Sequence, residues 1–167
     1  MATIRRLMAA LNDPWVWGQL VLLLLVAVGA PLLAALNLGP LDPLLGQMDP
    51  RWLRHLGLVV ATAGLVVGIF GALALGRNLT PATKPVDDGR LIQSGIYARI
   101  RHPIYTGVIL VVAGYMLWWT NWRDALLVGW LTMLYFGAKS GAEERKLLAK
   151  FPDYENYRRR VPRFFPF

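Results

Sequence analysis

The chain has no cysteine, and this absence excludes disulfide bonds, thiolate metal sites and cysteine nucleophiles. It has only two histidines, His55 and His102, and it contains neither an HExxH nor a GxGxxG motif. Charged residues make up only 17% of its 167 residues, which is few for an ordinary soluble domain. The templates of soluble metalloenzymes and dinucleotide-binding enzymes therefore do not apply, and no metal site is expected.

The chain is rich in apolar residues. Hydrophobic residues form 56% of the chain, and the mean hydropathy is +0.42. A chain of this length with so much apolar sequence predicts an integral membrane protein. We expect an all-α fold in one domain, residues 1–167, with about four transmembrane helices.

The first apolar run covers residues 15–36 and is long enough to cross a hydrocarbon core of about 30 Å. A signal peptide is the competing interpretation, because Arg5 and Arg6 precede the run. The apolar core of a signal peptide has only about 7 to 15 residues, whereas this run continues through Pro31. We therefore expect a membrane span.

The second apolar run, residues 57–75, predicts a second span. Gly64 and Gly68 lie four residues apart in this run, and small residues at that spacing let another helix approach closely. Such a face serves either dimerisation or packing within one chain. We expect packing within the chain.

The third and fourth apolar runs, residues 103–119 and 125–138, are separated only by TNWRD. So short a connection predicts an antiparallel helical hairpin. The fourth run is short for a membrane span. We therefore expect its helix to begin near Trp122 and to continue past Ala138 into the polar tail.

The net charge of +8 is not spread evenly along the chain. Basic residues exceed acidic ones before the first run, in residues 76–102 and in residues 139–167, whereas residues 37–55 and 120–124 are each neutral. Loops rich in lysine and arginine stay on the cytoplasmic side of a membrane. We therefore expect a multi-pass protein with both termini and residues 76–102 on the cytoplasmic side. Topology and membrane lipids then explain the basic excess, and no nucleic acid partner is expected.

A polar stretch, SGIYARIRHPIYTG, lies at residues 94–107, directly before the third run. His102 precedes Pro103, and proline is typical of the first position of a helix. Tyr97 and Tyr105 flank the histidine, and tyrosine rings suit a cation. An interfacial belt of anchoring side chains is the competing interpretation. The predicted topology places this stretch beside the tail, where the two can form one pocket.

The tail contains KSGAEERKLLAKFPDYENY, residues 139–157, which predicts one amphipathic helix with Leu147 and Phe151 facing inward. Lys139 and Glu143 are four residues apart and share a face of that helix. A solvated salt bridge between them, contributing about 0.2–0.5 kcal/mol, is the simplest interpretation. Their place in the first turns beyond the membrane favours a role in a site.

The segment LIQSGIYARIRHPIYTG, followed after the predicted hairpin by EERKLLAKFPDYENYRRRVP, resembles the isoprenylcysteine carboxyl methyltransferase family and its phospholipid methyltransferase relatives. The resemblance covers residues 77–167, while residues 1–76 match only as two generic spans. It implies an integral membrane methyltransferase that uses S-adenosylmethionine and releases S-adenosylhomocysteine. It also implies a lipophilic or lipidated substrate, and a cofactor pocket capped by the cytoplasmic C-terminal helix.

The same resemblance implies roles for individual residues. The candidate catalytic residues are Lys139, Glu143, Glu144 and His102. The implied cofactor contacts are Leu91, Ile92, Tyr97, His102, Pro103, Ile104, Tyr105 and Glu143. Glu143 matches a carboxylate that holds the amino group of the cofactor, and Lys139 falls where eukaryotic members carry an arginine that faces the substrate carboxylate. The chain departs from the family pattern at Ile96, Lys139 and Pro152, where a proline, an arginine and a glycine are usual.

The chemistry of the acceptor separates the two branches of this resemblance. A carboxylate, with a free pKa near ~3.5, arrives ionised and needs no general base. Its reaction with a cationic methyl donor also cancels two charges, which a site of low dielectric favours. An aminolipid must first lose a proton, and His102, Glu144 or Tyr105 would then act as the base.

No dedicated base pair is evident, so the sequence favours carboxyl O-methylation of an isoprenylcysteine-like substrate. N-methylation of an aminophospholipid is the first alternative. An NADPH-dependent membrane reductase of the sterol type and a non-enzymatic four-span scaffold are the others.

Overall fold

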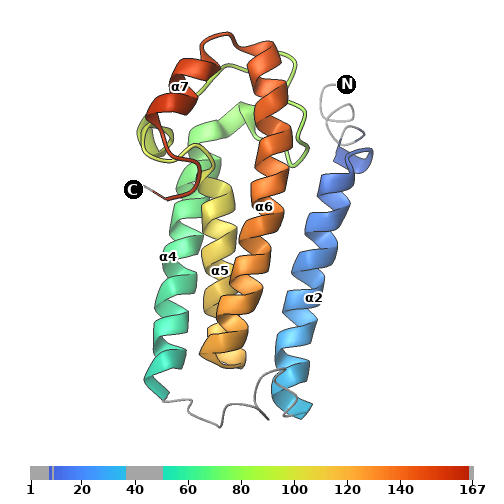
Figure 1. The fold of residues 1–167 in the computed structure, drawn as a ribbon, viewed down its shortest axis with the longest axis vertical. Helices are drawn as coiled ribbons and strands as arrows, with labels where there is room; N and C mark the ends of the chain where they lie inside the picture. The colour runs from blue at the N-terminus through green and yellow to red at the C-terminus, as the bar shows by residue number, and fades with distance from the viewer. Residues whose placement is uncertain (1–7, 9, 37–50, 166–167) are drawn as a thin grey trace.

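The computed structural model describes residues 8, 10–36 and 51–165 (Figure 1). Its helices are α2 (Pro14–Leu36), α4 (Arg51–Leu75), α5 (Pro103–Trp119), α6 (Trp122–Lys150) and α7 (Tyr154–Arg160), with short 3-10 turns η1 (Gly76–Asn78) and η2 (Gly95–Ala98). The described residues contain no β-strand, so the predicted all-α class is confirmed. Arg5, Arg6 and residues 37–50, on which part of the predicted topology rests, lie outside the described residues.

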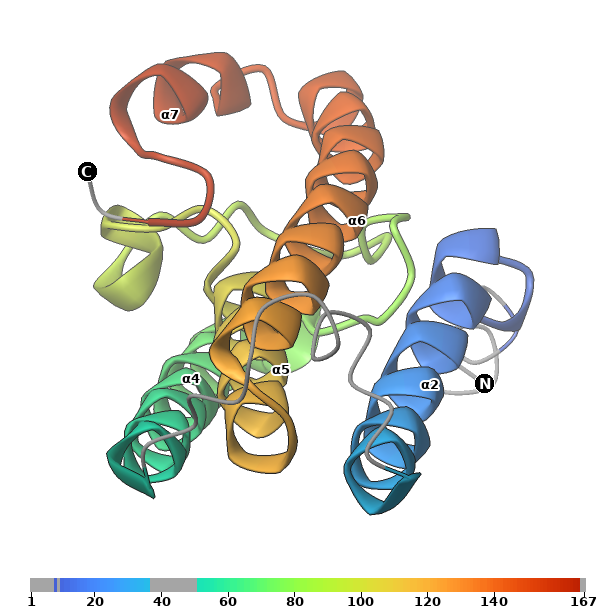
Figure 2. The same cartoon turned by 60° about the horizontal axis from the view of Figure 1, so that its bottom comes forward.

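Helices α4, α5 and α6 run side by side, and α2 stands apart from them (Figures 1 and 2). A small apolar cluster joins α2 to the hairpin, in which Val26 and Ala30 of α2 pack with Val112, Met116 and Ala125. The polar ends of the helices, the loop after α4 and helix α7 gather at one end of the bundle (Figure 1). The bundle therefore serves as a support for that polar end.

Glycines bring α4 and α5 together. Gly57, Gly64 and Gly71 are buried and lie seven residues apart on α4. A Cβ atom added to Gly64 would lie 2.7 Å from the carbonyl oxygen of Gly107 on α5, and one added to Gly68 would lie 3.9 Å from the Gly107 Cα atom. The predicted close approach at Gly64 and Gly68 is therefore packing within the chain, as expected.

The α5–α6 hairpin has the boundaries that the sequence predicts. Pro103 opens α5, and α6 begins at Trp122. Asn121 caps α6, because its side-chain oxygen accepts hydrogen bonds from the backbone N–H groups of Arg123 and Asp124, both at 3.0 Å. Helix α6 continues past Ala138 for three further turns, and this extension presents the tail residues to the site.

The tail does not form the single helix predicted for residues 139–157. Helix α6 ends at Lys150, and α7 begins only at Tyr154 and lies across the end of the bundle. Pro152 explains the break, because proline lacks an N–H group and disfavours helical backbone in the residue before it. As a result, α7 is a separate helix that lies across the polar end of the bundle.

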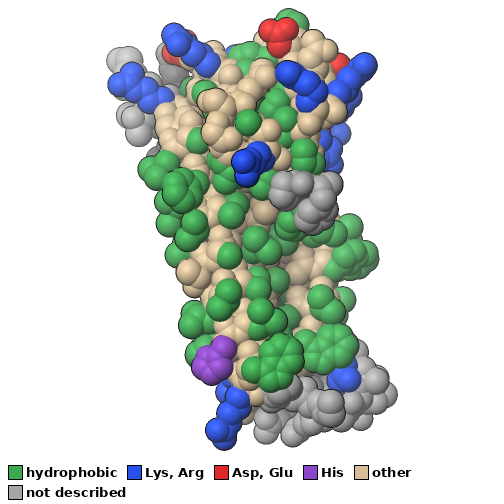
Figure 3. All heavy atoms as spheres, turned by 90° about the vertical axis from the view of Figure 1, so that its left-hand side faces the viewer, with side chains coloured by type: hydrophobic (Ala, Val, Ile, Leu, Met, Phe, Trp, Pro, Cys, Tyr) green, Lys and Arg blue, Asp and Glu red, His purple; other side chains and the backbone are tan. Residues whose placement is uncertain are grey.

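The face seen in Figure 3 is apolar along the bundle, with charged side chains gathered at the polar end and basic side chains and a histidine at the opposite end. Two helices, Pro14–Leu36 and Arg51–Asn78, are long and apolar enough to cross a membrane, and Pro103–Trp119 is a shorter apolar helix. Large apolar side chains such as Leu25 and Leu73 are 66% and 71% exposed. This surface suits a lipid environment, and the number of spans stays a prediction.

Candidate functional site

A cavity of about 330 Å³ lies at the polar end of the bundle. Its walls come from Gln19 on α2, the end of α4, residues 78–92, η2, the first turn of α5, the polar half of α6 and helix α7. All of the predicted cofactor contacts except Pro103 line it, and so do Lys139 and His102. Glu144 does not line it. The volume is within the range of small-molecule pockets.

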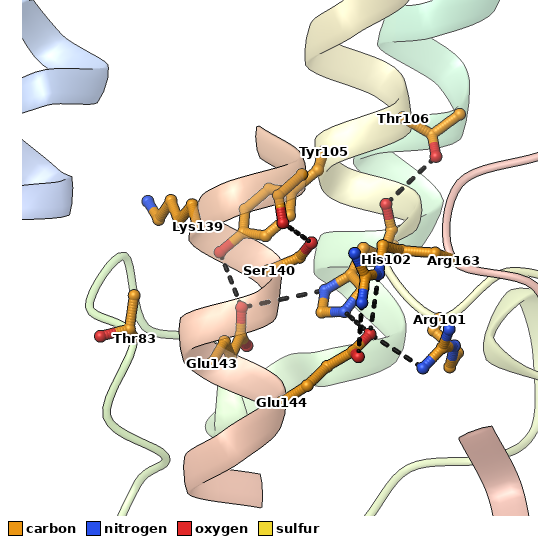
Figure 4. A network of polar contacts seen from close by, with 12 residues as sticks. Thr83, Arg101, His102, Tyr105, Thr106, Lys139, Ser140, Glu143, Glu144 and Arg163 are labelled. Atoms are coloured by element: carbon orange, nitrogen blue, oxygen red, sulfur yellow. Dashed lines mark hydrogen bonds and ion pairs between the residues drawn. The ribbon is translucent and has the colours of Figure 1, made fainter. Parts of the chain in front are cut away.

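Glu143, Tyr105 and His102 form the polar centre of the cavity (Figure 4). The Tyr105 hydroxyl donates to Glu143 Oε2 at 2.8 Å, and His102 Nδ1 lies 3.8 Å from the same oxygen. The rings of His102 and Tyr105 stack, with centroids 5.3 Å apart and planes inclined by 2°. A carboxylate beside aromatic faces is an arrangement that attracts a cation.

Glu144, one residue further along α6, has different surroundings. Its carboxylate is buried and accepts hydrogen bonds from His102 Nε2 at 3.0 Å and from Arg163 Nη2 at 2.9 Å, and Arg101 Nη1 lies 2.9 Å away. Burial alone would raise its pKa, but the hydrogen bonds from His102 and Arg163 outweigh burial and lower the pKa to about 2. Glu144 is thus ionised and fully engaged, and it is a poor proton acceptor.

Lys139 is completely buried on α6. Its ammonium donates to Gln19 Oε1 at 2.5 Å and to the Pro81 carbonyl oxygen at 3.2 Å. It also lies 5.4 Å from the centre of the Tyr105 ring. In Figure 4 it points toward α2 and away from Glu143, so the simple salt bridge along the helix is not formed. The site therefore holds a buried positive charge whose hydrogen-bond partners are neutral.

Helix α7 covers one side of the cavity. Tyr154 and Tyr157 are buried and line the cavity, and the Tyr157 hydroxyl donates to the Tyr97 carbonyl oxygen at 2.7 Å. Burial raises the pKa of Tyr157 to about 12, so its hydroxyl stays protonated at neutral pH. Packing of α7 thus fixes η2, which carries a predicted cofactor contact.

The C-terminal residues hold the His102 loop in place, a role that sequence reasoning missed. The backbone N–H groups of Arg101 and His102 donate to the carbonyl oxygens of Pro162 and Arg163 at 2.9 and 3.0 Å. The Thr106 hydroxyl donates to the Phe164 carbonyl oxygen at 2.6 Å. Backbone contacts between such distant segments leave no pattern in the sequence.

The loop between α4 and η2 is held by a second set of contacts that the sequence did not reveal. Lys146 on α6 donates to the Thr83 hydroxyl at 2.6 Å, and Lys150 donates to the Val86 carbonyl oxygen. Asp13, before α2, accepts hydrogen bonds from the Thr83 N–H and hydroxyl groups at 2.6 and 2.7 Å. The spacing of the lysines at 139, 146 and 150 along one helix face was the available signal.

Comparison with known proteins places this arrangement in a family. Residues 53–150 match the isoprenylcysteine carboxyl methyltransferase (ICMT) family. A protein-S-isoprenylcysteine O-methyltransferase of Schizosaccharomyces pombe is 35% identical over 86 residues, which are 51% of this chain and 36% of that protein. Protein-S-isoprenylcysteine O-methyltransferase B of Arabidopsis thaliana is 26% identical over 125 residues, which are 73% of this chain and 64% of that protein.

A relative with a different kind of name is also similar. The nickel-cobalt-cadmium resistance protein NccN of Alcaligenes xylosoxydans xylosoxydans is 25% identical over 120 residues, which are 72% of this chain and 54% of that protein. Within residues 8, 10–36 and 51–165, no group of three or more His, Asp or Glu side chains could hold a metal ion. The chain spans between about a third and two thirds of the length of these relatives. Because the family match covers more than half of its residues, the chain belongs to the isoprenylcysteine carboxyl methyltransferase family.

Proposed function

We propose that the protein is a membrane methyltransferase that uses S-adenosylmethionine to methylate the carboxylate of a lipophilic, isoprenylcysteine-like acceptor. One observation carries the proposal: a single cavity holds both a carboxylate beside aromatic rings, at Glu143 and Tyr105, and a buried ammonium, at Lys139. The first group suits a cationic donor and the second an anionic acceptor. Membership of the family supports the same pairing.

The cavity residues fit the donor. Glu143 and the hydroxyl of Tyr105 offer polar contacts for an amino group, and the aromatic faces of Tyr97 and Tyr105 suit a sulfonium cation. S-adenosylmethionine supplies an activated methyl group, so the chain has little covalent chemistry to perform. Its residues position two molecules and exclude water from the space between them.

The acceptor end of the proposal rests on Lys139. A buried ammonium with neutral partners gains most from an anion that enters the cavity. A carboxylate is already ionised at neutral pH and needs no base. N-methylation of an amine would require a free proton acceptor, and Glu144 is already engaged by Arg101, Arg163 and the ring of His102.

The proposed setting is a membrane crossed by α2, α4, α5 and the apolar half of α6, with the cavity at the cytoplasmic face. The apolar outer surface and the charged polar end support this arrangement. The basic residues of 76–102 and 139–167 lie at that same end, as cytoplasmic loops require. The acceptor would then enter from the lipid and the cofactor from the water.

The test is made on detergent-solubilised full-length protein. Calorimetry with S-adenosylhomocysteine should show binding, and labelled S-adenosylmethionine should transfer its methyl group to N-acetyl-S-farnesylcysteine and not to phosphatidylethanolamine. Glu143→Gln should lower the affinity for S-adenosylhomocysteine at least tenfold, since a hydrogen bond to a charged group contributes about 1.5–3 kcal/mol. Glu155→Gln, on α7 and outside the cavity lining, is the matched control and should leave the affinity for S-adenosylhomocysteine unchanged.

Two results would refute the proposal in different ways. If the wild-type protein does not bind S-adenosylhomocysteine, the proposed cofactor is wrong. If it methylates phosphatidylethanolamine alone, the proposed cofactor is right and the proposed acceptor is wrong.

A further inference from the structure

Gln19 is an unusual residue for its helix. The other residues from Trp15 to Leu36 are apolar or glycine, and α2 is one of the two helices apolar enough to cross a membrane. A side-chain amide in an apolar setting costs free energy unless it is hydrogen-bonded. Leucine would therefore suit the helix better at this position. The chain carries an amide there, and that amide lines the cavity.

The start of α2 is fixed against α6 at this point. The Tyr135 hydroxyl donates to the Trp15 carbonyl oxygen at 2.5 Å. A Cβ atom added to Gly18 would lie 2.8 Å from that hydroxyl oxygen, so the absence of a side chain at Gly18 leaves room for the end of the Tyr135 side chain. Asp13 ties the same end of α2 to Thr83. Gln19 consequently has a defined position beside Lys139.

The bond between Gln19 and Lys139 leaves donors for a ligand. An ammonium only donates, so the amide oxygen of Gln19 must face Lys139 and the amide NH₂ group must face elsewhere. Lys139 has three N–H donors, of which Gln19 and Pro81 account for two. Both side chains line the cavity. Together they offer a charged donor and a neutral donor, which suit the two oxygens of a carboxylate.

We infer that Gln19 is a specificity-determining residue of the site: it positions the Lys139 ammonium, adds its own N–H donors, and so selects a carboxylate acceptor. This inference rests on the proposed function. It places part of acceptor selection on α2, which lies outside the family-matched residues 53–150.

The test compares an acid with its ester. Binding of N-acetyl-S-farnesylcysteine and of its methyl ester is measured by calorimetry on the full chain, because the two ligands differ only in the carboxylate. Wild-type protein should bind the acid at least tenfold more tightly. Gln19→Glu should abolish this preference, because the new carboxylate pairs with Lys139, while S-adenosylhomocysteine affinity stays within twofold. Asn12→Asp, the same amide-to-acid change on an exposed residue outside the cavity, should keep the preference.

The uncharged variant Gln19→Leu keeps the inference testable if Gln19→Glu does not fold. It should lower the preference for the acid at least threefold and leave S-adenosylhomocysteine affinity unchanged. Wild-type protein that does not distinguish acid from ester would overturn the inference, and so would either variant that folds and keeps the full preference. Failure of the wild type to bind S-adenosylhomocysteine would instead overturn the proposed cofactor.

Discussion

The two long apolar helices, α2 and α4, are joined to the rest of the protein in opposite ways. Helix α4 meets α5 backbone to backbone along buried glycines. Helix α2 keeps only Val26 and Ala30 buried within its span and is held largely by polar bonds, from Tyr135 to the Trp15 carbonyl and from Lys139 to Gln19. Lipid tails are as apolar as leucine, so close packing and hydrogen bonds are what join helices in a membrane. Helix α4 therefore belongs to the scaffold, and α2 is a more separable element that touches the site.

The largest expected effect comes from closing the gap between α4 and α5. In Gly64→Ala the new Cβ atom would lie 2.7 Å from the Gly107 carbonyl oxygen and 2.8 Å from the Val111 nitrogen. Both are backbone atoms that cannot move aside alone, so we expect a loss of about 3 kcal/mol or more, at the upper end of overpacking effects.

Gly29→Ala on α2 is the matched control. A Cβ atom there meets nothing within 4 Å, and alanine favours a helix by about 1 kcal/mol over glycine. Thermal unfolding in detergent should show a lower midpoint for Gly64→Ala and an unchanged or higher one for Gly29→Ala. Equal midpoints in the two variants would contradict the division between scaffold and separable helix.

The second effect concerns Glu144, the buried glutamate beside the cavity. The folded-state pKa of Glu144 is about 2, below the ordinary value of 4.5, so its stabilising effect is present above pH 4.5 and is lost as the pH falls toward 2. The shift corresponds to roughly 3 kcal/mol at neutral pH. Unfolding midpoints measured between pH 6 and pH 3 should fall for the wild type.

Glu144→Gln should start from a lower midpoint and show a smaller fall over the same pH range. Its partners Arg101, His102 and Arg163 would face a neutral amide at every pH. A variant whose midpoint follows the wild-type curve would show that the ionised Glu144 carboxylate does not stabilise the folded protein through Arg101, His102 and Arg163.

Sequence patterns predicted most of what depends on neighbouring residues. The predicted helix starts at Pro103 and Trp122 agree with the structure, because proline is typical of the first helical position and the fourth apolar run is too short to span without an earlier start. His102, Tyr105 and Glu143 line one cavity, and their roles in cofactor binding stay predictions. Pro152 is the local signal for the break between α6 and α7, whereas the apolar spacing on either side of it predicts one continuous helix.

Contacts between distant segments could not be predicted in the same way. Gln19 appears in the sequence as a single polar residue in a span, and only the fold brings it to Lys139, 120 residues further along. The bonds from Arg101 and His102 to the C-terminal residues use backbone carbonyls, which every residue has. Such contacts depend on how the helices pack, and they cannot be predicted from the residues near each partner in the sequence.

The third effect is on activity and concerns the residue where α2 meets the site. Lys139→Glu should reduce methylation of N-acetyl-S-farnesylcysteine at least a hundredfold, because a carboxylate there repels the acceptor, and about 2.7 kcal/mol corresponds to that factor. Lys139→Arg should keep activity, since it keeps the charge. Steady-state assays and S-adenosylhomocysteine binding are the measurements. Undiminished activity of a folded Lys139→Glu protein would show that Lys139 does not contact the acceptor carboxylate.

The smallest effect distinguishes the two hydroxyl groups that hold α2. Tyr135 donates to the Trp15 carbonyl near the cavity, and Tyr115 donates to the Ala27 carbonyl at 3.0 Å further along the helix. Replacing either by phenylalanine should lower stability by about 0.6 kcal/mol, the typical size of such a bond between membrane helices. Only Tyr135→Phe releases the turn that carries Gln19, so only this variant should raise KM for the farnesylated acceptor, about threefold and with kcat unchanged. If both variants raise KM alike, α2 acts on the site as a whole helix and not through its first turns.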